Sequence, residues 1–278
     1  MDALEIIKKR TSVRTYEEKP VDDKCKVELE KICEEYRQGP FGSSLRFQLL
    51  DLVKINRQEL QSLGTYGVIK GARLYILGAV KEDRYCMEDL GYLMEEIILK
   101  ATVMGLGTCW LAGTFNRGSF AKQMKLEEKE LLPAITPVGY PGEQHSTVNG
   151  LIRFGVRAHR RKPWEELFFN ADGKPLSKEE AGTYRDALQA VRLGPSATNR
   201  QPWRLVRDLH GKYHLYLKET PLYNRVLGKI RIQNIDMGIA MCHFELVARQ
   251  RGNQGSWQVK EPELDFPGLK YIASWLED

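Results

Sequence analysis

The 278-residue sequence has few cysteines, no long uncharged run and no strong excess of either charge. Its five cysteines are scattered without a Cys-x-x-Cys pair, and their odd number favours a reduced, cytoplasmic environment. The N-terminal stretch MDALEIIKKR is too short and too charged for a secretion signal. The longest uncharged run, ATVMGLGTCWLAGTF, is too short and too glycine-rich to span a bilayer. We therefore expect a cytoplasmic protein without a membrane partner.

Signatures of metal-dependent and nucleophilic catalysis are missing as well. The five histidines show no zinc-ligand spacing with cysteine or aspartate, so we predict no metal site. His210 and His214 lie four residues apart in a strand-like hairpin, where we expect both at the surface. The sequence contains no Gly-x-Ser-x-Gly elbow and no Walker loop. A net charge of +5 permits a phosphate ligand but does not require nucleic acid.

The chain repeats itself. DLGYLMEEIILKATVMGLGTCW begins at Asp89, and DMGIAMCHFELVARQRGNQGSW begins 147 residues later at Asp236. Both stretches have apolar residues at helical spacing and end near a glycine. RQGP at Arg37 matches RLGP at Arg192, and strand-like runs follow each of them. Each half therefore reads as helix, Gly-Pro turn, strand, strand and long helix, which indicates an internal duplication.

The first half carries additional elements. It opens with a helix, DALEIIKKR, and continues after its long helix into AITPVGYP, a buried strand bounded by prolines. The polar stretch FNADGKPLSKEE contains Gly and Pro and is typical of a linker. We therefore expect a first lobe over residues 1–168, a linker over 169–180 and a second lobe over 181–278.

Two basic stretches are candidates for binding an anion. In KKRTSVRTY, Arg10 and Arg14 flank Ser12, and two guanidinium groups with a hydroxyl suit a phosphate dianion. A solvated basic turn is the alternative. RAHRRKPW holds the densest basic cluster and either contributes to the same phosphate, remains a solvated charge run, or binds nucleic acid. Its single neighbouring aromatic, Trp164, offers no repeated stacking platform for nucleic acid.

Two further stretches are candidates for contacting a flat ligand. In GLGTCWLAGTF, Gly113 would let the backbone approach a ring closely, although such a segment also suits ordinary packing. Its Gly-x-Gly follows a helix and is therefore not a dinucleotide fingerprint. In GPSATNRQPW, the side chains of Ser196, Thr198, Asn199 and Gln201 offer donors and acceptors suited to the edge of a heteroaromatic ring. A plain polar loop is the alternative reading.

Taken together, these motifs resemble the FMN-dependent nitroreductase family. The matching pieces are RTSVR, PSATNRQPW, GLGTCW, VGYP and RKPW, and they cover most of the chain. The resemblance implies an α+β fold with two duplicated lobes. Each lobe would have a central antiparallel-type sheet flanked by helices, and the two together would mimic a family dimer in one chain.

The order of the motifs departs from the family pattern. Family members are usually dimers with the flavin at the interface. One subunit contributes the phosphate-binding residues, and the other contributes the polar loop. Here the position expected for that loop in the first half holds GPFGSS, without Asn or Gln, and the second half lacks RTSVR and RKPW. The resemblance therefore implies one flavin site per chain, with a weak second site as the alternative. It also implies that a monomer can hold flavin, while higher assembly stays open.

The resemblance assigns roles to thirteen cofactor-binding residues. Arg10, Thr11, Ser12 and Arg14 would hold the FMN phosphate and ribityl chain, and Arg161 matches a late phosphate-binding arginine. The remaining residues would lie against the ring or support that contact: Leu111, Ala112, Gly113, Pro195, Ser196, Ala197, Asn199 and Gln201, the last supporting the loop.

The implied reaction is hydride transfer from NAD(P)H through FMN to a nitroaromatic, a quinone or a similar small-molecule acceptor. The flavin supplies the chemistry, so no catalytic side chain is assigned. Ala112 leaves only backbone where family members often have an acidic residue. Alternatives are a flavin-binding sensor or carrier without turnover, a flavin-cleaving or dehalogenating relative, and a nucleic-acid-binding protein.

Overall fold

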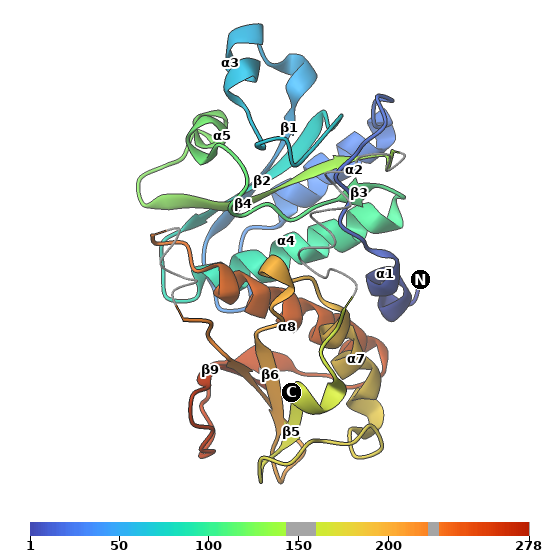
Figure 1. Cartoon of the computed structure of the whole chain (residues 1–278), viewed down its shortest axis with the longest axis vertical. Helices are drawn as coiled ribbons and strands as arrows, with labels where there is room; N and C mark the ends of the chain where they lie inside the picture. Colours follow the sequence, from blue (N-terminus) through green and yellow to red (C-terminus); the bar gives the residue numbers. More distant parts are fainter. Residues whose placement is uncertain (143–159, 222–227, 278) are drawn as a thin grey trace.

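The computed structural model describes residues 1–142, 160–221 and 228–277. Two long helices, α4 (Cys86–Val103) and α8 (Ile232–Gln250), lie side by side across the middle of the molecule. One β-sheet lies on either side of this helix pair (Figure 1). The predicted pair of lobes, each built on its own sheet, is confirmed.

The first sheet has strand order β1-β2-β4-β3, and all its pairings are antiparallel. Helices α2 and α4 pack on one face of this sheet and α5 on the other (Figure 1). The elements of this lobe are α2 (Asp23–Glu35), β1 (Leu45–Asp51), η1 (Leu52–Lys54), α3 (Arg57–Ser62), β2 (Leu74–Lys81), β3 (Gly107–Thr108), α5 (Arg117–Met124) and β4 (Glu130–Gly139).

The second sheet has strand order β5-β6-β7-β9-β8, with β5 parallel to β6 and the other pairings antiparallel. Helices α7 and α8 cover it with a core rich in aromatic side chains. Its elements are η2 (Trp164–Glu166), β5 (Phe168–Asn170), η3 (Gly182–Tyr184), α7 (Arg185–Leu193), η4 (Ala197–Asn199), β6 (Trp203–Arg207), β7 (Tyr213–Leu217), β8 (Ser256–Gln258) and β9 (Lys270–Leu276).

Two segments pack on the second lobe although the sequence analysis placed them in the first lobe or in the linker. Phe168–Asn170 forms β5, and Leu176 is buried in the second core, so much of the stretch expected as a linker is folded into the second lobe. The N-terminal helix α1 (Ala3–Lys9) also buries Leu4 and Ile7 in the second core, beside α7 (Figure 1). The chain then enters the first lobe, so residues 1–10 bridge the two lobes.

His214 lies inside the second sheet, not at the surface as expected. It is 3% exposed on the central strand β7, and its ring nitrogens contact Ser274 Oγ at 2.7 Å and Asp208 Oδ2 at 3.2 Å. Burial lowers the pKa of His214 despite the opposing effect of Asp208. The spacing of the two histidines gave no sign that β9 pairs with β7 and places Ser274 against the His214 ring.

The two long helices cross at equivalent glycines of the repeat. A Cβ atom added at Gly91 of α4 would overlap the Ile235 carbonyl, and one added at Gly238 of α8 would overlap the Glu88 carbonyl. Gly91 and Gly238 are 147 residues apart, as are Glu88 and Ile235. Such reciprocal contacts characterise a two-fold interface. Here the relation lies within one chain.

Gly238→Ala is expected to lower the free energy of unfolding by about 1–3 kcal/mol, because the new methyl group forces two packed backbones apart. The measurement is the urea midpoint followed by circular dichroism. Gly118→Ala is the matched control, since a Cβ there meets only Asn116 Oδ1 at 3.8 Å. Equal midpoints for the two variants would contradict this account of the crossing.

Glu88 carries an unusual carboxyl group beside the same crossing. It is 2% exposed and accepts a hydrogen bond from Asn234 Nδ2 at 2.6 Å. Its Oε2 atom has no hydrogen-bond partner among the described residues. Burial raises the pKa of Glu88 from 4.5 to about 7. The folded chain therefore holds a proton at Glu88 more tightly than the unfolded chain does.

Glu88→Gln is expected to stabilise the protein at pH 8 and to have little effect at pH 4.5. The raised pKa gives wild type a stabilising contribution that is complete below pH 4.5 and lost as the pH rises to about 7. The amide, which stays neutral, avoids that loss, which is on the order of 3 kcal/mol. Melting curves of wild type, Glu88→Gln and the exposed control Glu128→Gln check this. A Glu88→Gln effect that does not vary with pH would refute it.

Candidate functional site

A cavity of about 610 Å³ is lined by residues of both lobes. Its size lies within the range of small-molecule and cofactor sites. Twelve of the thirteen residues expected to bind a cofactor line it: Arg10, Thr11, Ser12, Arg14, Leu111, Ala112, Gly113, Arg161, Pro195, Ser196, Ala197 and Asn199. The structure thus brings together four stretches that are far apart in the sequence.

The basic end of the cavity is built on an extended segment that follows α1. Val13 N–H donates to the Thr108 carbonyl at 2.8 Å and Ser12 bridges Thr108, which fixes the segment along β3. In an extended chain every second residue shares a face, so Arg10, Ser12 and Arg14 share one face. Val13 points the other way, into the first core.

Positive charge is concentrated at this end. Arg161 donates to the Leu193 carbonyl at 3.0 Å and to Asn199 Oδ1 at 3.2 Å, which ties it to the second lobe. Burial, and then the like charges of Arg10 and Arg192, lower the pKa of Arg161 to about 10. The Arg14 Nε atom is buried without a hydrogen-bond partner among the described residues. A bound anion would relieve the repulsion and supply acceptors to these groups.

The polar loop forms the opposite wall in a strained conformation. Thr198, Asn199 and Gln201 have φ angles of 47°, 55° and 49°, values that cost free energy in residues other than glycine. Two hydrogen bonds fix the loop. Ala197 N–H donates to Asp236 Oδ1 of α8 at 3.0 Å, and Gln201 N–H donates to Ser196 Oγ within the loop at 2.9 Å. Strain at a ligand-facing loop is typical of a functional site.

Gln201 is the one expected residue that lies outside the cavity wall. It is 3% exposed, and its Oε1 atom accepts a hydrogen bond from Lys162 N–H at 2.8 Å. Its Nε2 donates to the carbonyls of Arg160 and Asn199 at 3.3 and 3.2 Å. Gln201 therefore joins the polar loop to Arg160 and Lys162 of the basic segment.

The equivalent loop of the first half is built differently. Asp89, which matches Asp236 in the repeat, accepts hydrogen bonds from Phe41 N–H and Ser43 N–H, both at 2.9 Å. The Phe41 ring packs against Tyr85 at 4.9 Å and against the second core. This loop thus keeps the aspartate anchor but places an aromatic ring where the second loop has Ser196.

A buried network joins the cavity wall to both long helices. Glu95 of α4 is fully buried and accepts a hydrogen bond from Trp110 Nε1 at 2.6 Å. Its other oxygen lies 2.9 Å from His243 Nε2 and 3.8 Å from Arg10 Nε. His243 Nδ1 lies 3.0 Å from the Ala190 carbonyl, which can only accept, so this nitrogen carries a proton. Trp110 and Arg10 line the cavity, so Glu95 supports two residues of its wall.

Several lining residues were missed by the sequence analysis. Ile232, Ile235 and Ile239 of α8 form an apolar strip in the cavity wall, and their helical spacing gave no means to tell this strip from core. The other lining residues without an assigned cofactor role are Ile7, Lys8, Val68, Cys109, Trp110, Thr114, Leu193, Thr198 and Asp236. Of these, Thr198 was singled out for its side chain, and Lys8, Cys109, Trp110 and Thr114 stood in candidate stretches without being singled out.

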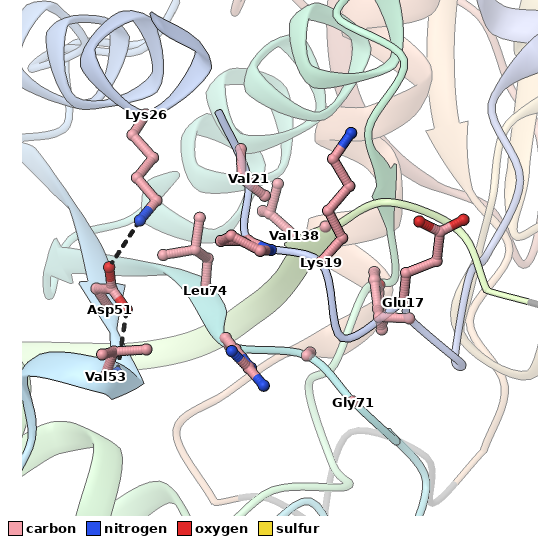
Figure 2. A pocket seen from close by; sticks show the side chains of 14 residues that line it. Glu17, Lys19, Val21, Lys26, Asp51, Val53, Gly71, Leu74 and Val138 are labelled. Atoms are coloured by element: carbon pink, nitrogen blue, oxygen red, sulfur yellow. Dashed lines mark hydrogen bonds and ion pairs between the residues drawn. The ribbon is translucent and has the colours of Figure 1, made fainter. Parts of the chain in front are cut away.

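Figure 2 shows a second, much smaller pocket in the first lobe. It holds about 20 Å³, room for little more than a water molecule. Lys26 and Asp51 form an ion pair of 3.1 Å at its edge. This pocket is too small for an organic cofactor.

None of the described helices is long and apolar enough to cross a bilayer. The described residues hold no group of three or more His, Cys, Asp or Glu side chains that could bind a metal ion.

The basic stretch RAHRRKPW contains four Arg and Lys residues. Of these, Arg157 lies outside the described residues, whereas Arg160, Arg161 and Lys162 lie within them.

Comparisons with known proteins gave matches to nitroreductases. A family model described as "Putative TM nitroreductase" matches residues 2–248. A "Putative NADH dehydrogenase/NAD(P)H nitroreductase" of Methanothermobacter thermautotrophicus is 27% identical over 160 residues, covering 53% of this chain and 81% of the relative. The structure of a "putative nitroreductase" from Thermotoga maritima is 20% identical, and the match covers 99% of this chain and 92% of that chain with a TM-score of 0.61.

A nitroreductase with bound FMN from Desulfitobacterium hafniense is 16% identical, covering 52% of this chain and 92% of its own, with a TM-score of 0.43. The family model spans nearly the whole chain, and the Thermotoga structure shares its overall fold. The chain belongs to the nitroreductase family.

Proposed function

We propose that this chain is an FMN-dependent oxidoreductase that passes hydride from NAD(P)H to a nitroaromatic, a quinone or a similar acceptor. One observation carries the proposal: twelve residues assigned to flavin binding from scattered motifs line one cavity between the lobes. The relatives' names support the nicotinamide and nitroreductase parts of the reaction.

The residues present fit FMN. Arg10, Arg14 and Arg161 line the cavity and suit a phosphate, and Arg14 Nε is a buried donor without a partner among the described residues. The strip of Ile232, Ile235 and Ile239 offers an apolar surface to a flat ring, and the polar loop offers hydrogen-bonding groups to its edge. When bound, FMN supplies the hydride chemistry. The chain binds it, orients it and shields it from water.

We further propose that the chain acts as a fused pseudo-dimer with one flavin site. The first lobe gives the basic segment and the second gives the polar loop, and a single cavity uses both. The reciprocal glycine crossing supports a two-fold origin. Phe41, packed on Tyr85, fills the loop position where a second site would need polar groups. We place the first lobe within residues 1–168 and the second at 181–278, with residues 164–176 folded onto the second lobe.

The test uses protein loaded with FMN under anaerobic conditions. Addition of NADH or NADPH should bleach the visible absorption of the bound flavin, and addition of a quinone or nitroaromatic should restore it. Bound flavin that neither cofactor bleaches would reject the enzyme and favour a flavin carrier or sensor. Absence of flavin binding would reject both proposals.

A further inference from the structure

The ring-facing segment Leu111–Gly113 is held from outside the cavity by a short piece of β-ladder. Leu111 N–H donates to the Ile135 carbonyl at 3.0 Å, and Ile135 N–H donates back to Leu111 at 2.9 Å. The next position of β4 that could donate in this ladder is Pro133. Proline has no N–H, so the ladder ends there. Without another contact, the peptide between Ala112 and Gly113 would have no fixed orientation.

Arg117, in the first turn of α5, makes hydrogen bonds to both segments at the point where the ladder ends. Its Nε atom donates to the Leu132 carbonyl at 2.9 Å, and its Nη2 atom donates to the Pro133 carbonyl at 3.3 Å. The same Nη2 donates to the carbonyl of Ala112. The guanidinium lies over the Phe115 ring, 4.8 Å from its centroid. One side chain therefore ties the cavity segment to β4.

The contact to Ala112 fixes the direction of the following N–H. A trans peptide is planar, so its C=O and N–H point in opposite directions. The Ala112 carbonyl points to Arg117, which is not part of the cavity wall, whereas Ala112 and Gly113 both line the cavity. The Gly113 N–H consequently points toward the cavity. Neither this N–H nor that of Ala112 has a hydrogen-bond partner among the described residues.

We propose that Arg117 is a positioning residue that aims the Gly113 N–H at an acceptor atom on the edge of the bound flavin ring. The inference rests on the proposed function and goes beyond it, because Arg117 touches no ligand itself. A backbone donor fixed before the ligand arrives needs no reorganisation on binding. Ala112 supplies no polar side chain, so the orientation of this peptide determines which polar group the segment presents.

The test compares wild type, Arg117→Ala and Arg46→Ala, each titrated with FMN and with riboflavin, which has the same ring but no phosphate. Arg46 is the matched control, since it also binds a backbone carbonyl and a β4 residue but lies outside the cavity wall. We expect Arg117→Ala to raise both dissociation constants about tenfold, the worth of one hydrogen bond. The visible spectrum of its bound flavin should move toward that of free flavin.

Millimolar guanidinium ion should restore the affinity of Arg117→Ala, and Arg117→Lys should lose less than the alanine variant. A loss that neither guanidinium nor lysine reduces would show general destabilisation and overturn the inference, as would Arg117→Ala titrations that match those of Arg46→Ala. Wild type that binds no flavin would instead reject the proposed function, and this inference with it.

Discussion

Arg14→Ala should raise the FMN dissociation constant about 10- to 150-fold and leave riboflavin binding close to that of wild type. Arg14 lines the cavity, as do Arg10 and Arg161, and its buried Nε atom has no hydrogen-bond partner among the described residues. A hydrogen bond to a charged group contributes about 1.5–3 kcal/mol, which corresponds to that range. The measurement is quenching of flavin fluorescence on titration with protein.

The comparison with riboflavin separates a phosphate contact from a general defect. Arg14→Lys keeps the charge but loses the planar fork, so it should fall between wild type and Arg14→Ala. A variant that weakens FMN and riboflavin equally would place Arg14 near the ring or in the framework of the site. Unchanged FMN affinity would reject the phosphate assignment altogether.

Glu95→Ala should lower the free energy of unfolding by about 3–5 kcal/mol, because removing one member of a buried ionic network leaves the other members buried without a partner. Trp110 Nε1 and His243 Nε2 lose their hydrogen-bond partner, and Arg10 loses the carboxylate that lies 3.8 Å from its Nε atom. Two of them line the cavity, so FMN affinity should fall as well. Urea unfolding and FMN titration of the same preparations check both effects.

Glu95→Gln is the informative companion variant. The glutamine carbonyl can accept from Trp110, and its amide can donate to His243 Nε2 when that nitrogen carries no proton. Most of the stability should therefore return, and only the negative charge beside Arg10 is lost. If Glu95→Ala unfolds at the same urea concentration as wild type, the network does not join the lobes as described.

The repeat in the sequence was sufficient to predict the two lobes and their long helices. Apolar periodicity and the Gly-Pro turns are local signals, and they placed α4, α8 and the strands β1, β2, β6 and β7 correctly. The joint motifs also identified twelve residues that line the cavity. These motifs are local too, because each resides in a single loop or helix end.

What could not be predicted depends on long-range packing. The stretch containing Phe169 and Asn170 is polar and looked like a linker, yet it extends the second sheet through a parallel pairing with β6. The strip of α8 isoleucines has the spacing of a core helix face, and only the tertiary structure shows that it borders a cavity. Arg117 carried no motif, because its role depends on Pro133, which lies in strand β4.

The central claim is that one flavin site is assembled from two fused lobes, and flavin stoichiometry tests it most directly. Purified protein is saturated with FMN, freed of excess ligand by gel filtration, and measured for flavin per chain and for molecular mass in the same run. We expect one flavin per chain, retained in a monomer. Two flavins per chain would mean that the loop at Phe41 also binds, and flavin found only in dimers would contradict the fused-lobe account.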